Sequence, residues 1–115
     1  MIFPALYALI VGIGMIGQWL FSLVTGRVPE LETEPIRIRF HIAAEFATAL
    51  VLVIAGLGLL TTQSWSRWFY MMSMGMLLYT VIVSPGYFAQ KGEWSFVGMF
   101  AVLLILALAS IAIVA

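Results

Sequence analysis

The sequence predicts an all-α integral membrane protein, a four-transmembrane-helix bundle formed by a single domain of 115 residues. Hydrophobic residues make up 64% of the chain and charged residues only 9%, whereas roughly a quarter of the residues in soluble proteins are charged. A chain this short has too little interior to hide so much apolar surface, so the excess is expected to face lipid. Helices are the expected element because they satisfy their own backbone hydrogen bonds in a bilayer.

The charged residues divide the chain into four apolar stretches of membrane-spanning length. A helix rises roughly 1.5 Å per residue and the hydrocarbon layer is about 30 Å thick, so about 20 apolar residues cross it once. We expect the spans near residues 3–24, 36–60, 68–88 and 94–114. The first stretch lacks a basic leader and a small-residue cleavage site, so it is expected to stay on the mature protein rather than act as a secretory signal.

Local signals mark the ends of these spans. Thr33 is expected to cap the second span, with Pro35 in its first turn, where no amide donor is needed. The sequence Ser84-Pro85-Gly86 is expected to end the third span. Aromatic residues lie where interfacial anchors are expected, at Trp19, Trp65, Trp68, Tyr87 and Trp94.

Small residues predict where the helices approach one another closely. A helix face without bulky side chains lets two backbones come near. The small residues are Gly12, Gly14 and Gly17 in the first span, Ala43 and Ala47 in the second, and Gly98 and Ala101 in the fourth.

The positive charges predict the orientation in the membrane. With four spans, the first and third loops share one side, and the second loop shares the other side with both termini. The first side carries Arg27, Arg37, Arg39 and Lys91, and the second carries Arg67 alone. Because cytoplasmic loops are enriched in Lys and Arg, we expect both termini outside, in the cytoplasmic (inner) membrane.

Composition also narrows the function. Five Lys and Arg balance five Asp and Glu, so there is no basic field for nucleic acid. Cysteine is absent, which excludes a thiolate metal site, a Cys nucleophile and an iron–sulfur cluster. The single histidine cannot supply both axial ligands of a haem within a monomer. The sequence therefore implies no covalent or metal cofactor.

Polar residues of the first three spans are expected to gather in one leaflet, next to the first loop. Glu45 is an ionisable group inside a span, which usually has a partner or a function because it is costly there. Arg37, His41, Glu45 and Thr48 follow helical spacing and share one face. The expected pocket is walled by Gln18 and Ser22 from the first span, Arg37, His41 and Glu45 from the second, and Tyr79 and Thr80 from the third.

A structural role is the alternative for each of these residues. Gln18, Ser22, Thr80 and Ser84 also suit hydrogen bonds between helices or to backbone carbonyls one turn back. A buried Glu45 can fix the packing of the bundle without binding anything. The sequence leaves both interpretations open.

Three features between His41 and Gly86 point to a known family. They are Glu45 early in the second span, the run Gly56-Leu57-Gly58-Leu59-Leu60 at its end, and Gly75 as a small-residue step in the third span. In these features the segment resembles the central part of small four-helix membrane proteins of the DoxX-like kind. The resemblance implies a membrane subunit linked to quinone or thiol redox metabolism.

Two functions fit these observations best. The first is a non-catalytic accessory subunit whose pocket binds a lipophilic molecule such as a quinone, or docks a membrane redox subunit. Gln18, His41 and Tyr79 are expected to supply donors to the quinone carbonyls. The second is a proton-coupled transporter of a small solute that acts as a homo-oligomer, a dimer, in which Glu45 exchanges the proton. The small multidrug exporters are of the same size. A membrane enzyme ranks last, because His41 and Glu45 could serve as acid and base but nothing marks a nucleophile.

Overall fold

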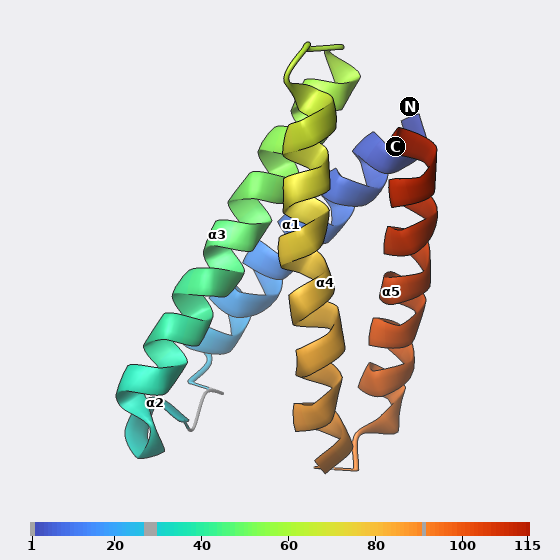
Figure 1. The fold of residues 1–115 in the computed structure, drawn as a ribbon. Helices are drawn as coiled ribbons and strands as arrows, with labels where there is room; N and C mark the ends of the chain where they lie inside the picture. Colours follow the sequence, from blue (N-terminus) through green and yellow to red (C-terminus); the bar gives the residue numbers. More distant parts are fainter. Residues whose placement is uncertain (1, 27–29, 91) are drawn as a thin grey trace.

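Four long helices make up most of the computed structural model, which describes residues 2–26, 30–90 and 92–115 (Figure 1). They are α1 (Ile2–Val24), α3 (Pro35–Leu60), α4 (Ser66–Gln90) and α5 (Trp94–Val114), and the short helix α2 (Glu30–Thr33) lies between α1 and α3. All four long helices are long and apolar enough to cross a membrane. The described part of the chain has no strand. The predicted all-α fold is therefore confirmed, and the chain is an integral membrane protein whose helix ends lie within two residues of the expected ones.

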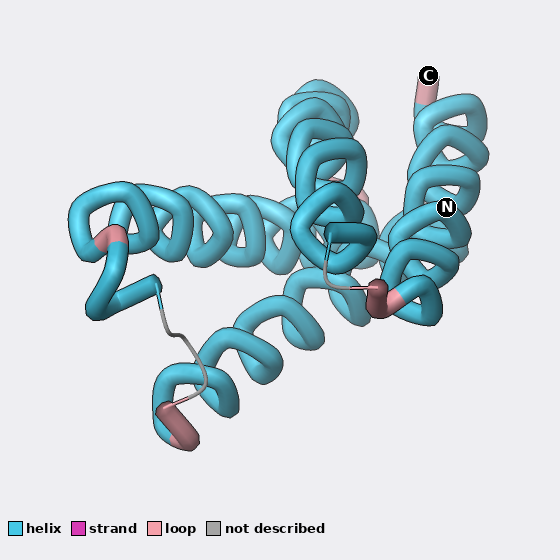
Figure 2. Tube along the Cα trace, turned by 90° about the horizontal axis from the view of Figure 1, so that it is seen from below, coloured by secondary structure: helices cyan, strands magenta, loops and turns pink. Residues whose placement is uncertain are grey.

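Each long helix packs against two others. α1 contacts α3 and α5, and α4 likewise contacts α3 and α5. Both termini and the α3–α4 turn lie at one end of the bundle, which we call the terminal end (Figure 1). The helix α2 and the α4–α5 turn lie at the other end, which we call the open end. The α1–α3 pair leans away from the α4–α5 pair toward the open end, as both views show (Figures 1 and 2).

The buried core lies toward the terminal end. Buried side chains occur within residues 4–12 of α1, 45–59 of α3, 66–81 of α4 and 107–114 of α5. The described residues of these helices that lie closer to the open end are at least partly exposed. The core cluster comprises Ala5, Tyr7, Ala8, Leu52, Ala55, Leu59, Tyr70, Met74, Leu77, Val81, Ala107 and Val114. The four helices therefore pack more tightly at the terminal end than at the open end.

Two glycines bring the backbones of α1 and α3 close together. A Cβ at Gly12 would lie 2.9 Å from the Ala49 carbonyl oxygen, and a Cβ at Gly56 would lie 2.9 Å from the Ala5 carbonyl oxygen. The predicted close approach is thus confirmed for Gly12. It is wrong for Gly14, Gly17 and Gly98, where a Cβ would meet nothing within 4 Å. Spacing alone did not reveal that α1 turns Gly12 toward α3 and leaves Gly14 and Gly17 exposed.

The α3–α4 turn is tied by backbone hydrogen bonds. The Gln63 amide donates to the Gly58 carbonyl at 3.0 Å, and Thr62 adopts φ 54° in the left-handed region, which is the geometry of a Schellman helix end. The Ser66 hydroxyl donates to the Gln63 carbonyl at 2.7 Å as α4 begins. These bonds hold α3 and α4 together at the terminal end.

Two of the local signals predicted to mark helix ends are wrong, although the ends lie within two residues of the expected spans. The third span does not end at Ser84-Pro85-Gly86, because Pro85 lies inside α4 and the helix continues to Gln90. Membrane helices tolerate proline because local adjustment and neighbouring groups satisfy the freed carbonyl. The helix ends instead where Gly92 adopts φ 75° and the Glu93 amide bonds to the Phe88 carbonyl at 2.9 Å.

The second span also begins differently from the prediction. Thr33 belongs to α2, and Glu34 is the N-cap residue of α3, with Pro35 in the first turn as expected. The charges of Arg27 and Lys91 and the side chain of Tyr87, which entered the predictions above, lie outside the described residues.

Candidate functional site

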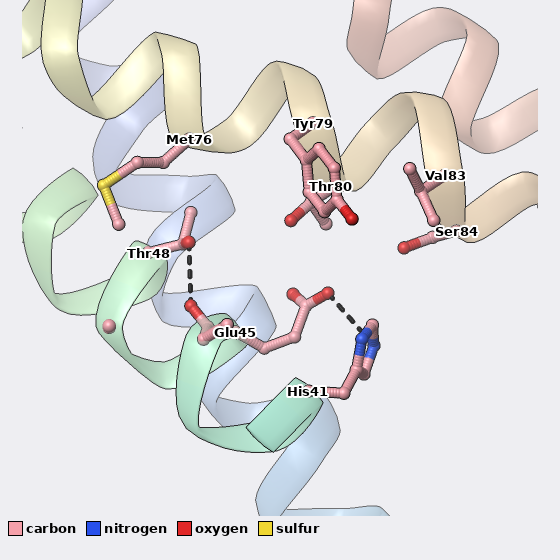
Figure 3. Close-up of a pocket in the computed structure, with 10 residues that line it drawn as sticks. His41, Glu45, Thr48, Met76, Tyr79, Thr80, Val83 and Ser84 are labelled. Carbon is pink, nitrogen blue, oxygen red and sulfur yellow. Dashed lines mark hydrogen bonds and ion pairs between the residues drawn. The ribbon is translucent and has the colours of Figure 1, made fainter. Parts of the chain in front are cut away.

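A cavity lies between α3 and α4 in the half of the bundle nearer the open end (Figure 3). Its volume is about 290 Å³, close to the lower end of the roughly 300–1,000 Å³ typical of small-molecule sites. The lining residues are His41, Ala44, Glu45, Ala47 and Thr48 from α3, and Met76, Tyr79, Thr80, Val83 and Ser84 from α4. Ala44 and Ala47 leave room because their side chains are short. Met76 and Val83 make the α4 wall partly apolar.

Glu45 and His41 form the charged part of this cavity. They lie one turn apart on α3, with Nε2 of His41 3.4 Å from Oε1 of Glu45 (Figure 3). The Glu45 side chain is only 6% exposed, whereas the His41 side chain is 43% exposed. A buried carboxylate is costly unless donors surround it, so His41 is one of the groups that make Glu45 tolerable at this depth.

Side chains from two neighbouring helices lie beside the His41–Glu45 pair. Thr80 of α4 lines the same cavity, and Trp19 comes from α1. The Trp19 ring also packs edge-on against the His41 ring, with centroids 5.8 Å apart and planes at 67°. Residues of three helices, α1, α3 and α4, therefore surround the His41–Glu45 pair.

Thr48 closes the deep end of the cavity. Its hydroxyl donates to the Ala44 carbonyl at 2.8 Å (Figure 3), a bond to the preceding turn that Ser and Thr often make in membrane helices. The hydroxyl proton is thereby used within α3. What Thr48 offers to the cavity is the lone pairs of its oxygen.

The structure brings together four of the seven predicted site residues. His41, Glu45, Tyr79 and Thr80 line one cavity. Gln18 and Ser22 do not line it, and Gln18 is exposed on α1. Arg37 is 81% exposed and donates to Oε2 of Glu34 at 3.0 Å, so it belongs to the start of α3 rather than to the cavity.

Sequence reasoning missed Trp19 as a site residue and treated it as an interfacial anchor. The face of α1 that meets α3 passes through Gly12 and Trp19, which are seven residues apart and so lie on one side of a helix. Gln18 is adjacent to Trp19 and therefore points elsewhere. The spacing from Gly12 was the signal that could have identified Trp19.

This arrangement suits a ligand that has a polar head group and an apolar body. The cavity combines a carboxylate, an imidazole and four hydroxyl groups with alanine, valine and methionine walls. Neither Lys nor Arg is among its lining residues. The described part of the chain gathers no group of three or more His, Cys, Asp or Glu side chains around a common point, so His41 and Glu45 stand as a pair.

Comparison with known protein families assigns the chain to one of them. The family model described as a domain of unknown function (DUF8058) matches residues 2–115. The chain belongs to the DUF8058 family. No curated protein and no solved structure matches this DUF8058 chain. The resemblance to DoxX-like proteins stays a prediction.

Proposed function

We propose that the protein is a non-catalytic membrane subunit that binds a lipophilic molecule with a polar head, such as a quinone, between α3 and α4. The single observation that carries this proposal is the placement of Glu45. Its side chain is 6% exposed, and it lies in the wall of a cavity with His41 at 3.4 Å. An ionisable group kept at this depth in a membrane usually serves a function.

The position of the cavity supports a ligand that arrives from the bilayer. The helix pairs separate toward the open end (Figures 1 and 2), and the cavity lies in that half of the bundle. Tyr79 at its edge is 71% exposed on a helix that is apolar enough to span the membrane. A molecule dissolved in lipid can therefore enter laterally, from the bilayer, and reach the polar groups of the cavity.

Native mass spectrometry of the protein released from mild detergent tests this proposal. The wild type is expected to retain one lipophilic molecule, and Glu45→Ala and His41→Ala are expected to lose it. Gln18→Ala is the matched control, because it removes a polar side chain from α1 that does not line the cavity. Equal retention by all four proteins would contradict the proposal.

The DoxX-like resemblance supplies a context for this function. It supports a place beside a membrane redox subunit, with quinone or thiol metabolism as the setting. We place the protein in the cytoplasmic (inner) membrane with both termini outside. Two described arginines, Arg37 and Arg39, lie near the start of α3 at the open end, and Arg67 lies near the start of α4 at the terminal end, which agrees with that orientation.

A second function is supported by the same carboxylate. Glu45 in a cavity with a polar, partly exposed partner suits a proton-coupled transporter, in which it would exchange a proton for a small solute in a homo-oligomer. Solute flux into liposomes driven by a pH gradient tests this alternative. Flux that is abolished by Glu45→Gln would favour transport, and the absence of flux, or equal flux in the variant, would exclude it.

A further inference from the structure

Gln18 is an exposed polar side chain within the membrane-spanning part of α1. Ile13 is the middle residue of this helix (Ile2–Val24), and Gln18 follows it by roughly 7–8 Å along the helix axis. Because the hydrocarbon layer extends about 15 Å on each side of its centre, Gln18 lies inside it. The side chain has no hydrogen-bond partner among the described residues. An unpaired amide is costly in lipid, so Gln18 calls for a partner from outside the chain.

Two glycines leave room for another helix to approach Gln18. Gly14, Gly17 and Gln18 lie on the side of α1 opposite to Gly12, which packs against α3. We call this surface the Gln18 face. Gly14 and Gly17 are exposed, and a Cβ at either would meet nothing within 4 Å. Small residues let membrane helices pack backbone to backbone, so the Gln18 face has the composition of a helix-packing surface.

The Gln18 face continues an existing interface between helices. Tyr7 lies on the same side of α1, seven residues before Gly14, and its hydroxyl donates to the Leu103 carbonyl of α5 at 2.6 Å. Toward the open end the α1–α3 pair leans away from the α4–α5 pair (Figures 1 and 2). The side of α1 that packs against α5 near the terminal end is therefore uncovered at Gly14 and Gln18.

We propose that a second copy of this chain covers the Gln18 face, in a two-fold symmetric dimer in which the α1 helices of the two copies cross. A two-fold interface brings the same surface of both copies together. A carboxamide has both donor and acceptor atoms, so each Gln18 side chain can donate to the other across the axis. The glycines allow the close approach that this exchange needs. α1 carries no charged side chain, so the two helices do not repel each other.

The dimer goes beyond the proposed function and does not depend on it. The α3–α4 cavity is lined only by residues of α3 and α4, so each copy keeps a complete cavity. Gln18→Met removes the amide from a side chain of similar length. It should therefore weaken the dimer while the protein still retains its lipophilic ligand.

Energy transfer between copies of the full chain in lipid vesicles tests the dimer. The chain has no cysteine, so Ser64→Cys in the α3–α4 turn takes a single donor or acceptor dye. The two labelled proteins are mixed, and dilution with lipid gives the dissociation constant of the dimer. Gln18→Met, made in the same background, should weaken the dimer roughly 3- to 30-fold, as expected for hydrogen bonds between membrane helices.

A pair of glycine substitutions places the interface. Gly14→Ile should abolish the dimer, because a branched side chain keeps the two α1 helices apart. Gly98→Ile is the matched control, since Gly98 is an exposed glycine of α5 at which a Cβ would also meet nothing within 4 Å. It should leave the dissociation constant unchanged. Circular dichroism establishes that each variant keeps its helices.

Three results would overturn the inference. The first is energy transfer no greater than random encounter at every dilution, which would show a monomer. The second is a dimer that is equally stable with Gln18 and with Gln18→Met. The third is a dimer disrupted by Gly98→Ile but not by Gly14→Ile, which would place the interface on α5. Each of these leaves the proposed function standing, because ligand retention is measured separately by native mass spectrometry.

Discussion

Nε2 of His41 lies 3.4 Å from Oε1 of Glu45, one turn earlier on α3. This contact links a partly exposed imidazole to a buried carboxylate. His41 therefore lies between the outside of the cavity and Glu45. Trp19 packs edge-on against the same imidazole, which restricts how the ring can turn. The pair is the feature on which the proposed function depends.

The first prediction concerns His41. Replacing it with Leu removes the donor to Glu45 and should weaken binding of the ligand by at least about tenfold. His41→Gln keeps an N–H donor on a side chain of similar reach and should recover most of the affinity. Titrating a quinone into each variant in lipid nanodiscs and measuring its affinity checks this expectation. Equal affinities for the Leu and Gln variants would show that the donor of His41 is not used.

A second prediction concerns the packing of α1 against α3. A Cβ at Gly12 would lie 2.9 Å from the Ala49 carbonyl oxygen, so Gly12→Ala forces the two backbones apart. We expect it to lower the free energy of unfolding by about 1–3 kcal/mol. The measurement is unfolding of the detergent-solubilised protein by increasing fractions of denaturing detergent.

Gly14→Ala is the control for this packing prediction. A Cβ at Gly14 meets nothing within 4 Å, so the stability should be unchanged or raised by up to about 1 kcal/mol through better helix propensity. If the two alanine variants unfold alike, the close approach at Gly12 is not as described.

The third prediction compares two core tyrosines. The Tyr7 hydroxyl donates to the Leu103 carbonyl of α5 at 2.6 Å, so Tyr7→Phe should cost about 0.5–1.5 kcal/mol of stability. The Tyr70 hydroxyl is buried and has no hydrogen-bond partner within the described residues. Tyr70→Phe should therefore be neutral or stabilising. The same unfolding assay checks both, and a larger loss for Tyr70→Phe would reveal a bound water or other partner at that hydroxyl.

The fourth prediction concerns orientation. The chain has no cysteine, so a single introduced thiol reports one position. Ser64→Cys lies in the α3–α4 turn and Glu32→Cys lies in α2, at opposite ends of the bundle. With both termini outside, a membrane-impermeant maleimide should label Ser64→Cys on intact spheroplasts and Glu32→Cys only after lysis. The reverse pattern would invert the topology.

The sequence was sufficient to predict the fold class because lipid imposes a strong and simple requirement. Apolar stretches of spanning length had to be helices, and each helix ends within two residues of its expected position. The local signal at Pro85 was misleading. The motif Ser84-Pro85-Gly86 is typical of a helix end in water, yet the helix continues to Gln90, because a membrane-spanning helix tolerates a missing amide donor.

The site was only partly predictable because spacing fixes which residues share a face but not where that face points. His41 and Glu45 were predicted together since they lie one turn apart on the same helix. Gln18 was predicted to join them from α1 and does not, because α1 turns Gly12 and Trp19 toward α3 instead. In a chain that is apolar on all sides, that rotation is set by close packing between helices rather than by polarity.

Photolabelling with a lipid-soluble quinone analogue, followed by peptide mapping, tests the central claim most directly. If the α3–α4 cavity binds the ligand, the label should concentrate on the cavity-lining residues Met76 and Val83, should be displaced by unlabelled quinone, and should be lost in Glu45→Ala. Labelling spread evenly over lipid-facing residues such as Ile105 of α5, unaffected by competitor or by Glu45→Ala, would contradict it.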